Sequence, residues 1–240
     1  MVIDVCFSPA LYPCYRRAGA EVVIVDVFRA TTTLVAAFES GAHRILPVAT
    51  TEEAESYKAR GWLVGAERNV RRCPFADFGN SPFDYTPDRV KGKEIVFTTT
   101  NGTKAIRCAQ QEPSRIVTGA FVNLQAVAED CLREKRPVVV LCSGWEDRIN
   151  MEDTLFGGAL AEILLAHGYQ PAGDAAQIAL SLWNEAKKDL RGYLERTEHI
   201  ERLKANGLEN NIACCLTLNR SSLTPVFSRE EGKLFIERNH

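Results

Sequence analysis

The feature that most constrains the fold of this chain is the alternation of short, β-branched apolar runs with segments of helical period. Residues 22–27 read VVIVDV, and a run this apolar predicts a central strand that is buried on both faces. Residues 32–39 follow with a helical period, and Gly41 is placed to end that helix. The same alternation continues along most of the sequence and predicts an α/β fold, in which helices cover a mostly parallel sheet.

Further elements follow from the same patterns. Strands are predicted over residues 45–48, 62–65, 94–99, 115–118 and 138–142, and helices over residues 51–60, 103–110, 123–134 and 152–166. Residues 174–205 are predicted to be helical with one interruption near Gly192, and residues 212–218 to form a strand. A closing antiparallel hairpin is predicted from residues 226–227 and 234–236, around a Glu-Gly turn.

Residues 66–92 interrupt this rhythm, because they carry Pro, Gly, Asn, Asp and Arg with neither a helical nor a strand period. Loops this long are uncommon inside a compact domain and are usually functional or disordered. Three Phe and one Tyr in the segment favour burial over disorder. The segment is therefore predicted to be an ordered loop that lines a site.

The composition is that of an ordinary soluble globular protein, with 45% apolar and 25% charged residues. A length of 240 residues without a low-complexity linker favours one domain over residues 1–240. Lys and Arg total 29 against 31 Asp and Glu, so no basic excess indicates nucleic acid or a membrane as a partner. Neither a signal-peptide pattern nor a membrane-length apolar run is visible. The eight cysteines lack zinc-type spacing, so we expect reduced thiols and a cytoplasmic protein.

Ligands of open α/β sheets bind outside the carboxyl ends of the strands, and three such ends here carry polar residues. At the first, a buried strand is followed by Asp26, Arg29, Thr31, Thr32 and Thr33. The start of the helix, the hydroxyls and Arg29 would together hold a phosphate. Asp26 would need a cation between itself and that phosphate, or would attack it. Alternatively, the threonines only cap the helix and Asp26 pairs with Arg29.

The other two strand ends repeat this logic. The second is followed by a hydroxyl run, an Asn-Gly turn and a helix start, comprising Thr99, Thr100, Asn101, Gly102, Thr103 and Lys104. The third is followed by a tight turn at Ser143 and Gly144, and Glu152 and Asp153 lie in the first turn of the next helix. Those two acids either only favour the helix start or help to hold a hard cation. In the long loop, Arg68 is a candidate anion clamp, and Asn80 and Ser81 offer polar side chains in a turn.

Other catalytic classes fit less well. The four histidines neighbour no plausible nucleophile in the sequence, and no GxSxG, Walker A or GxGxxG pattern is present. Phe28 stands where phosphatases of the haloacid dehalogenase type carry a second Asp. The residues alone therefore indicate an anion-binding α/β protein that acts on a phosphate ester with a divalent cation.

Taken together, these segments resemble the 2-phosphosulfolactate phosphatase (ComB-type) family. The matching stretches are VDVFRATTT at 25–33, GAERN at 65–69, FGNSP at 78–82, FTTTNGT at 97–103, SG at 143–144, MED at 151–153 and TPVF at 224–227. The resemblance implies a three-layer α/β/α fold and a Mg²⁺-dependent phosphatase that hydrolyses (2R)-2-phospho-3-sulfolactate to 3-sulfolactate and phosphate. In some organisms the family is linked to coenzyme M biosynthesis. The alternatives are a phosphatase for another small phosphorylated hydroxy acid, or a non-catalytic anion-binding module; a homodimer is left open.

The resemblance also implies roles for residues. Asp26 is expected to be a metal ligand or nucleophile, and Glu152 or Asp153 a second metal ligand or general base, with Glu152 preferred as the ligand. The phosphate is expected at Arg29, at residues 31–33 and at residues 99–103, with Ser143 and Gly144 beside it, and Asn80 and Ser81 as further substrate contacts. Arg68 or Lys104 would hold the sulfonate or carboxylate.

Two departures from the family pattern bear on these expectations. The family tends to have a Gly-rich turn after its Glu-Arg pair, where this chain has residues 69–72, Asn-Val-Arg-Arg. Arg71 or Arg72 could therefore have taken over recognition of the sulfonate. Asn211 and Asn219 stand where the family tends to carry Asp, so neither is expected to bind a metal.

Overall fold

The computed structural model describes residues 1–110, 115–231 and 233–238. Its strands are β1 (Val2–Cys6), β2 (Glu21–Val25), β3 (Arg44–Pro47), β4 (Leu63–Arg68), β5 (Arg71–Arg72), β6 (Glu94–Thr98), β7 (Arg115–Gly119), β8 (Val138–Cys142), β9 (Gln170–Pro171), β10 (Pro225–Glu230) and β11 (Lys233–Arg238). Its α-helices are α1 (Tyr12–Tyr15), α2 (Ala30–Glu39), α3 (Thr51–Lys58), α4 (Pro87–Val90), α5 (Gly102–Ala109), α6 (Leu124–Glu134), α7 (Met151–Ala166), α8 (Asp174–Ala186), α9 (Leu190–Leu194), α10 (Glu198–Ala205) and α11 (Glu209–Cys215).

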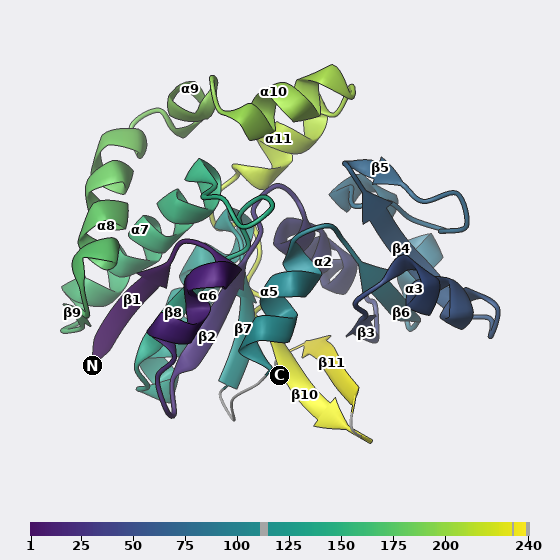
Figure 1. The fold of residues 1–240 in the computed structure, drawn as a ribbon, viewed down its shortest axis with the longest axis horizontal. Helices are drawn as coiled ribbons and strands as arrows, with labels where there is room; N and C mark the ends of the chain where they lie inside the picture. Colours follow the sequence, from purple (N-terminus) through teal and green to yellow (C-terminus); the bar gives the residue numbers. More distant parts are fainter. Residues whose placement is uncertain (111–114, 232, 239–240) are drawn as a thin grey trace.

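The sheet consists of two mostly parallel halves joined by an antiparallel hairpin (Figure 1), and the short β5 pairs antiparallel with β4. Within the described residues its strand order is β5-β4-β6-β3-β11-β10-β7-β2-β8-β1-β9. β10 pairs antiparallel with β7 and β11 antiparallel with β3, so the C-terminal hairpin lies between the two halves. The predicted mostly parallel α/β sheet with a closing antiparallel hairpin is thus confirmed. Of the predicted Glu-Gly turn, Gly232 lies outside the described residues.

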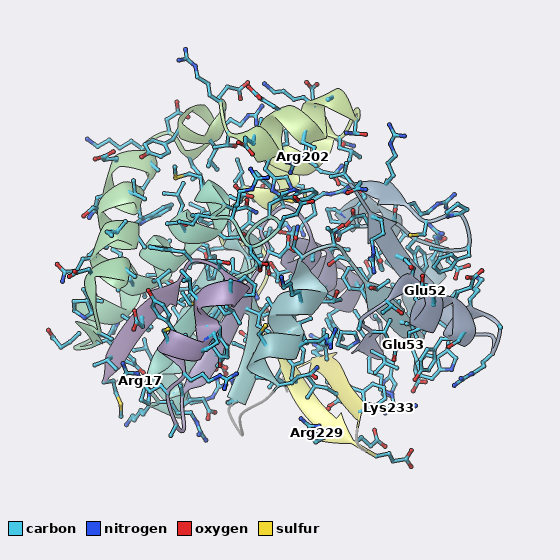
Figure 2. The ribbon with its side chains drawn as sticks, viewed as in Figure 1. Arg17, Glu52, Glu53, Arg202, Arg229 and Lys233 are labelled. Carbon is cyan, nitrogen blue, oxygen red and sulfur yellow. The ribbon has the colours of Figure 1, made fainter. Side chains whose placement is uncertain are left out.

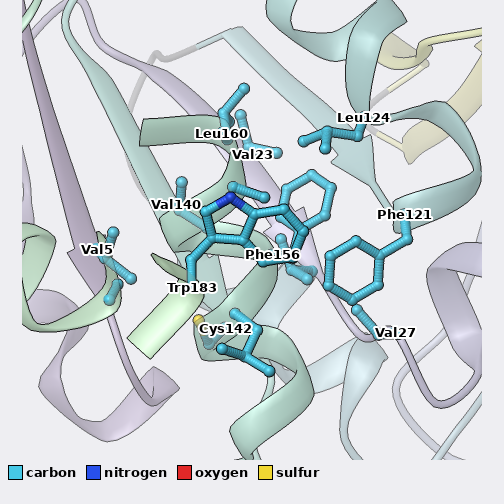
Figure 3. Packing of buried hydrophobic residues seen from close by; sticks show 14 of the residues in the cluster. Val5, Val23, Val27, Phe121, Leu124, Val140, Cys142, Phe156, Leu160 and Trp183 are labelled. Carbon is cyan, nitrogen blue, oxygen red and sulfur yellow. The ribbon is translucent and has the colours of Figure 1, made fainter. Parts of the chain in front are cut away.

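Helices cover both faces of the half that contains β2. Val23 and Val25 pack into one core with α6, α7 and α8, whereas Val22 and Ile24 pack into a second core with α2 and α5. Every residue of β2 is buried, which explains its continuous apolar run. Figure 3 shows the first core, where the Trp183 ring stacks on Phe121 with 5.9 Å between ring centroids. The predicted three-layer arrangement therefore holds in this half.

The carboxyl ends of the parallel strands gather at one edge of the sheet, and the helices α9, α10 and α11 lie across that edge (Figure 1). Contacts support this position: His199 of α10 hydrogen-bonds Glu152 of α7, and Asn206, just after α10, accepts a hydrogen bond from Arg71 of β5. The C-terminal helices thus connect the two parallel halves above the strand ends.

Several predicted elements are wrong. Residues 212–218 do not form a strand, because residues 209–215 are helix α11, which buries Ile212 and Cys215 at a helical spacing of three. Residues 174–205 contain two breaks between α8, α9 and α10 rather than one, and Gly192 lies inside α9. The 66–92 segment is ordered, as predicted, but it includes β5 and α4. β1, β5 and β9 were not predicted.

Two further predictions concern the chemistry of the chain. All eight cysteines lie in the described part and carry free thiols. No helix among the described residues combines the length and apolar character that crossing a membrane requires.

Candidate active site

The three polar strand ends lie at the same edge of the sheet. β2 and β8 are neighbours in the sheet, and the Ser143 N–H donates to the Val25 carbonyl at 2.8 Å. β6 belongs to the other half of the sheet, but α5, which follows it, packs against β2. At the first residue of α5, a Cβ on Gly102 would lie 3.0 Å from Asp26 Oδ2 and 3.1 Å from Thr99 Oγ1. The backbone of this helix start therefore approaches the Asp26 carboxylate closely.

Asp26 itself holds the start of α2. Its Oδ1 accepts a hydrogen bond from the Ala30 N–H at 3.3 Å, and its carbonyl accepts one from the Thr31 N–H at 3.0 Å. No described residue donates a hydrogen bond to Oδ2, the oxygen beside Gly102. One carboxylate oxygen thus fixes the side chain and the other is available to a ligand.

The three threonines after Asp26 bond to the backbone. The hydroxyls of Thr31, Thr32 and Thr33 donate to the carbonyls of Asp26, Val27 and Asn80 at 2.9, 3.0 and 3.2 Å. Arg29, whose side chain makes no capping bond, occupies the N-cap position of α2. The hydroxyl run therefore shapes the junction, and its contact with phosphate stays a prediction.

Glu152 and Asp153 at the start of α7 are both about 1% exposed. Asp153 Oδ1 accepts from the Val27 N–H at 2.9 Å and Oδ2 accepts from the Gly144 N–H at 3.2 Å. Asp153 thereby ties the first strand end to the third. Burial raises its pKa well above the usual value, and the charges of Glu152 and Asp26 raise it further. With both oxygens bonded, Asp153 fits a positioning role.

His199 is a site residue that the sequence reasoning missed. Its Nδ1 hydrogen-bonds Glu152 Oε1 at 2.6 Å, and its ring makes edge contacts with Phe28 and Trp145, with centroids 5.4 and 5.6 Å apart. His199 Nε2 and Glu152 Oε2 are buried, and no described residue bonds to them. His199 is 47 residues from its partner, so proximity along the chain gave no signal for it.

Burial raises the pKa of Asp26 to about 6, and the charges of Glu67 and Glu152 add to this effect. The charge of His199 and the Ala30 N–H act in the opposite direction. Glu67, also missed from the sequence, is buried; its Oε1 accepts from the Val70 N–H at 2.5 Å and from the Thr100 hydroxyl at 3.2 Å. The strand ends thus concentrate negative charge that is costly to bury.

Arg29 is the buried cation beside this cluster. Its Nη2 donates to the Val70 carbonyl at 3.0 Å and its Nη1 to Asn211 Oδ1 at 3.4 Å. Its described hydrogen-bond partners are thus neutral, so the alternative of an Asp26–Arg29 pair is not seen. Arg29, Asn80, Ser81 and Asn211 line a cavity of about 310 Å³, together with Arg72 and others. The structure therefore brings the predicted Asn80 and Ser81 to the guanidinium.

The oxygen atoms that follow the three strand ends suit a magnesium ion. Glu152 Oε2, Thr99 Oγ1 and Ser143 Oγ are buried with no partner among the described residues, and Asp26 Oδ2 lies near Thr99. The described side chains include no group of three His, Cys, Asp or Glu placed together as metal ligands. Magnesium usually takes only one or two carboxylates, with water and phosphate oxygens completing its shell, so the donor set fits.

The remaining predicted residues divide into two groups. Arg68 donates to Thr98 Oγ1 at 3.0 Å, Asn101 Oδ1 accepts from the Glu146 N–H at 3.2 Å, and the Thr103 hydroxyl donates to the Thr99 carbonyl at 2.9 Å. These three stay close to the second strand end. Lys104 instead forms an exposed ion pair with Asp147 at 2.6 Å and lines a separate surface cavity with Arg107 and Arg229.

Comparison with known proteins agrees with the resemblance seen in the sequence. Residues 6–230 match the family model described as 2-phosphosulpholactate phosphatase. A protein of Thermotoga maritima is 36% identical over 225 residues, which cover 94% of this chain and 95% of that protein. One of Symbiobacterium thermophilum is 34% identical over 93% of this chain and 97% of its own length, and one of Synechococcus sp. strain WH7803 is 38% identical over 85% of each. All three are named probable 2-phosphosulfolactate phosphatases. This chain belongs to the 2-phosphosulfolactate phosphatase family.

Proposed function

We propose that the protein is a Mg²⁺-dependent phosphatase that hydrolyses (2R)-2-phospho-3-sulfolactate to 3-sulfolactate and phosphate. Family membership supports the reaction class and the substrate. The observation that carries the proposal is the meeting of Asp26 Oδ2 with the start of α5, beside Glu152 and the buried Arg29. In the proposal, Asp26, the N–H groups at the start of α5 and the guanidinium of Arg29 act together on the phosphate.

The start of α5 is the better place for the phosphoryl group. At α2, Asp26 already accepts the Ala30 and Thr31 N–H groups. At α5, the N-cap residue Asn101 makes no side-chain capping bond, so the first N–H groups of the helix remain available to an anion. Gly102 has no side chain, so the start of α5 can come close to Asp26 Oδ2.

Magnesium, held by Asp26 and Glu152, would neutralise charge on the transferring phosphoryl group. Arg29 would bind the phosphate through N–H groups not used by Val70 and Asn211. His199 would hold Glu152 in position through its Nδ1, and Asp153 would keep the first and third strand ends together. Asp26 acts as metal ligand in this arrangement; attack by Asp26 on phosphorus is the alternative role.

A panel of phosphate esters tests the proposal. Phosphate release would be measured with Mg²⁺ for phosphosulfolactate, for 2-phospholactate, which lacks the sulfonate, and for p-nitrophenyl phosphate. The expected result is the highest kcat/KM on phosphosulfolactate. Preference for 2-phospholactate would favour an enzyme for another phosphorylated hydroxy acid, and no release from any ester would favour an anion-binding module. The cytoplasmic location and the link to coenzyme M biosynthesis stay predictions, and a homodimer is left open.

A further inference from the structure

A second cavity, of about 430 Å³, is rich in arginine. Arg68, Asn69, Arg71, Trp145, Arg202 and Asn206 line it, together with Val70. We call it the arginine cavity. Its guanidinium groups come from the β4–β5 hairpin and from α10, so two segments that are far apart in the sequence converge to build it. Figure 2 labels Arg202 on α10, the helix that crosses above the strand ends.

The charges of these arginines are not neutralised by carboxylates. No acidic residue lines the cavity, and within the described residues none of the three arginines forms an ion pair. Elsewhere, Arg44 pairs with Glu94 and Arg115 with Glu21. An anionic ligand would therefore meet uncompensated positive charge in the arginine cavity.

Neutral partners nevertheless hold the three guanidinium groups in place. Arg202 lies over the Trp145 ring, 3.7 Å from its centroid. Arg71 Nε donates to Asn206 Oδ1 at 3.3 Å, and Arg68 Nη2 donates to Thr98 Oγ1 at 3.0 Å. Such partners orient a guanidinium without removing its charge, and pre-orientation lowers the entropy lost when a ligand binds.

The arginine cavity shares walls with the proposed catalytic site. Trp145 contacts the ring of His199, which hydrogen-bonds Glu152. Val70 lines both cavities, and its carbonyl accepts the hydrogen bond from Arg29. These shared residues make the arginine cavity the candidate volume for the other end of a small substrate whose phosphate lies at Asp26.

We propose that the arginine cavity binds the end of the substrate that is not transferred, and that Arg202 is the residue that reads its sulfonate. This inference rests on the proposed function for the identity of the substrate. After phosphate is removed, that end carries one carboxylate and one sulfonate, two negative charges that three guanidinium groups would face. Guanidinium groups bind the oxygens of such anionic groups through charge-assisted hydrogen bonds. Lys104 and Arg72 have no part in this subsite, because they line other cavities.

Arg202→Met tests the inference, because it keeps an unbranched side chain and removes the guanidinium. A charge-assisted hydrogen bond lost in this way predicts that KM for phosphosulfolactate rises by about 10–100-fold. The rise should be at least about tenfold larger than for p-nitrophenyl phosphate. Arg202→Lys should recover part of the loss. Lys204→Met, which removes a positive charge from the same helix outside the cavity, should leave KM unchanged. Equal losses on both esters would overturn the proposal.

Binding of 3-sulfolactate, measured by calorimetry, separates this inference from the proposed function. The compound carries both anionic groups and no phosphate, so its binding does not depend on turnover. Weaker binding in Arg202→Met and in Arg71→Met supports the arginine cavity even if phosphosulfolactate is not hydrolysed. Undiminished binding in both folded variants contradicts the cavity even if the phosphatase activity is confirmed.

Discussion

The carboxylate cluster of Asp26, Glu152 and Asp153 and the arginine cavity are neighbours built in opposite ways. The carboxylates are at most 8% exposed and lie at the ends of central strands or the start of α7. The arginines come from the long loop and from α10, and neutral groups hold them at the surface of a cavity. Rigid strand ends suit groups that must be placed accurately for chemistry, whereas loops and added helices suit recognition.

The difference also has an energetic side. Burial raises the pKa of Asp26 and of Asp153, so keeping these groups ionised costs folding free energy. Arg71 is exposed and Arg68 and Arg202 are half-buried, so the arginines bear less of this cost. The cluster therefore resembles a functional site that reduces stability.

The largest effect is expected from Asp26→Asn. The amide has nearly the same shape but offers no negative charge to a cation and cannot attack phosphorus, so turnover should fall by about a thousandfold on every ester. Phosphate release by the folded variant is the measurement. A variant that keeps more than about a tenth of the wild-type rate, a loss below about 1.4 kcal/mol in barrier, would make Asp26 a structural residue.

Removal of the divalent cation should lower turnover by about a hundredfold or more, because a Lewis acid supplies several kcal/mol of charge stabilisation. Mg²⁺ should restore the rate after chelation. Ca²⁺ should restore it poorly, since its longer bonds and looser geometry position a phosphate less well. A rate that survives exhaustive chelation would remove the metal from the account.

Asp26→Asn should also stabilise the metal-free protein at neutral pH. The Asp26 pKa rises from 3.8 to about 6 on folding, so the folded state binds this proton more tightly than the unfolded state. Stability is therefore lost as pH rises from about 4 to about 6, and above that the full penalty, at most about 3 kcal/mol, applies. Urea unfolding with a chelator should show a more stable variant at pH 7.5 and a smaller gain at pH 4.5. Destabilisation at pH 7.5 would show that the carboxylate chiefly supports the fold.

Gly102→Ala should lower kcat by about tenfold, because its Cβ would lie 3.0 Å from Asp26 Oδ2 and small displacements of reacting groups are costly. The unfolding free energy should change by no more than about 1 kcal/mol, because the helix preference of Ala opposes the tight contacts of its Cβ with Ala30 and Thr99. Gly173→Ala is the matched control, because a Cβ there meets nothing within 4 Å. Equal activity of the two variants would show that the approach of α5 to Asp26 is unimportant.

The smallest effect is expected from Lys104→Met, although the sequence pattern included Lys104 among the substrate residues. Its ammonium group is exposed and paired with Asp147, and exposed pairs contribute about 0–1 kcal/mol. Activity and unfolding free energy should stay close to wild type. A selective rise in KM for the sulfonated ester would instead show that Lys104 binds the substrate.

Sequence patterns predicted most of the sheet because its strands are buried on both faces and read as continuous apolar runs, as in β2 and β8. They failed for residues 212–218, whose mixture of Ile, Cys and Leu is compatible with a strand until the packing of α11 is known. β5 and β9 have two residues each, too few for a periodic pattern. Short elements depend on tertiary contacts rather than on local preference.

Sequence patterns likewise found some residues of the site and missed others. Asp26, Gly102 and Glu152 could be singled out because each directly follows a strand or begins a helix. His199 and Arg202 could not, because α10 is brought to the strand ends only by the fold, and nothing near them in the sequence indicates a ligand. Local sequence patterns do not predict which residues far apart in the sequence are brought together by the fold.

The most direct test of the division between chemistry and recognition is the ratio of kcat/KM for phosphosulfolactate to that for 2-phospholactate, measured in Asp26→Asn and in Arg202→Met. We expect Asp26→Asn to lower both values by the same factor, so that the ratio stays at its wild-type value. We expect Arg202→Met to lower the ratio by about tenfold or more. An unchanged ratio in Arg202→Met, or a ratio altered as strongly by Asp26→Asn, would contradict the assignment of separate roles to the two regions.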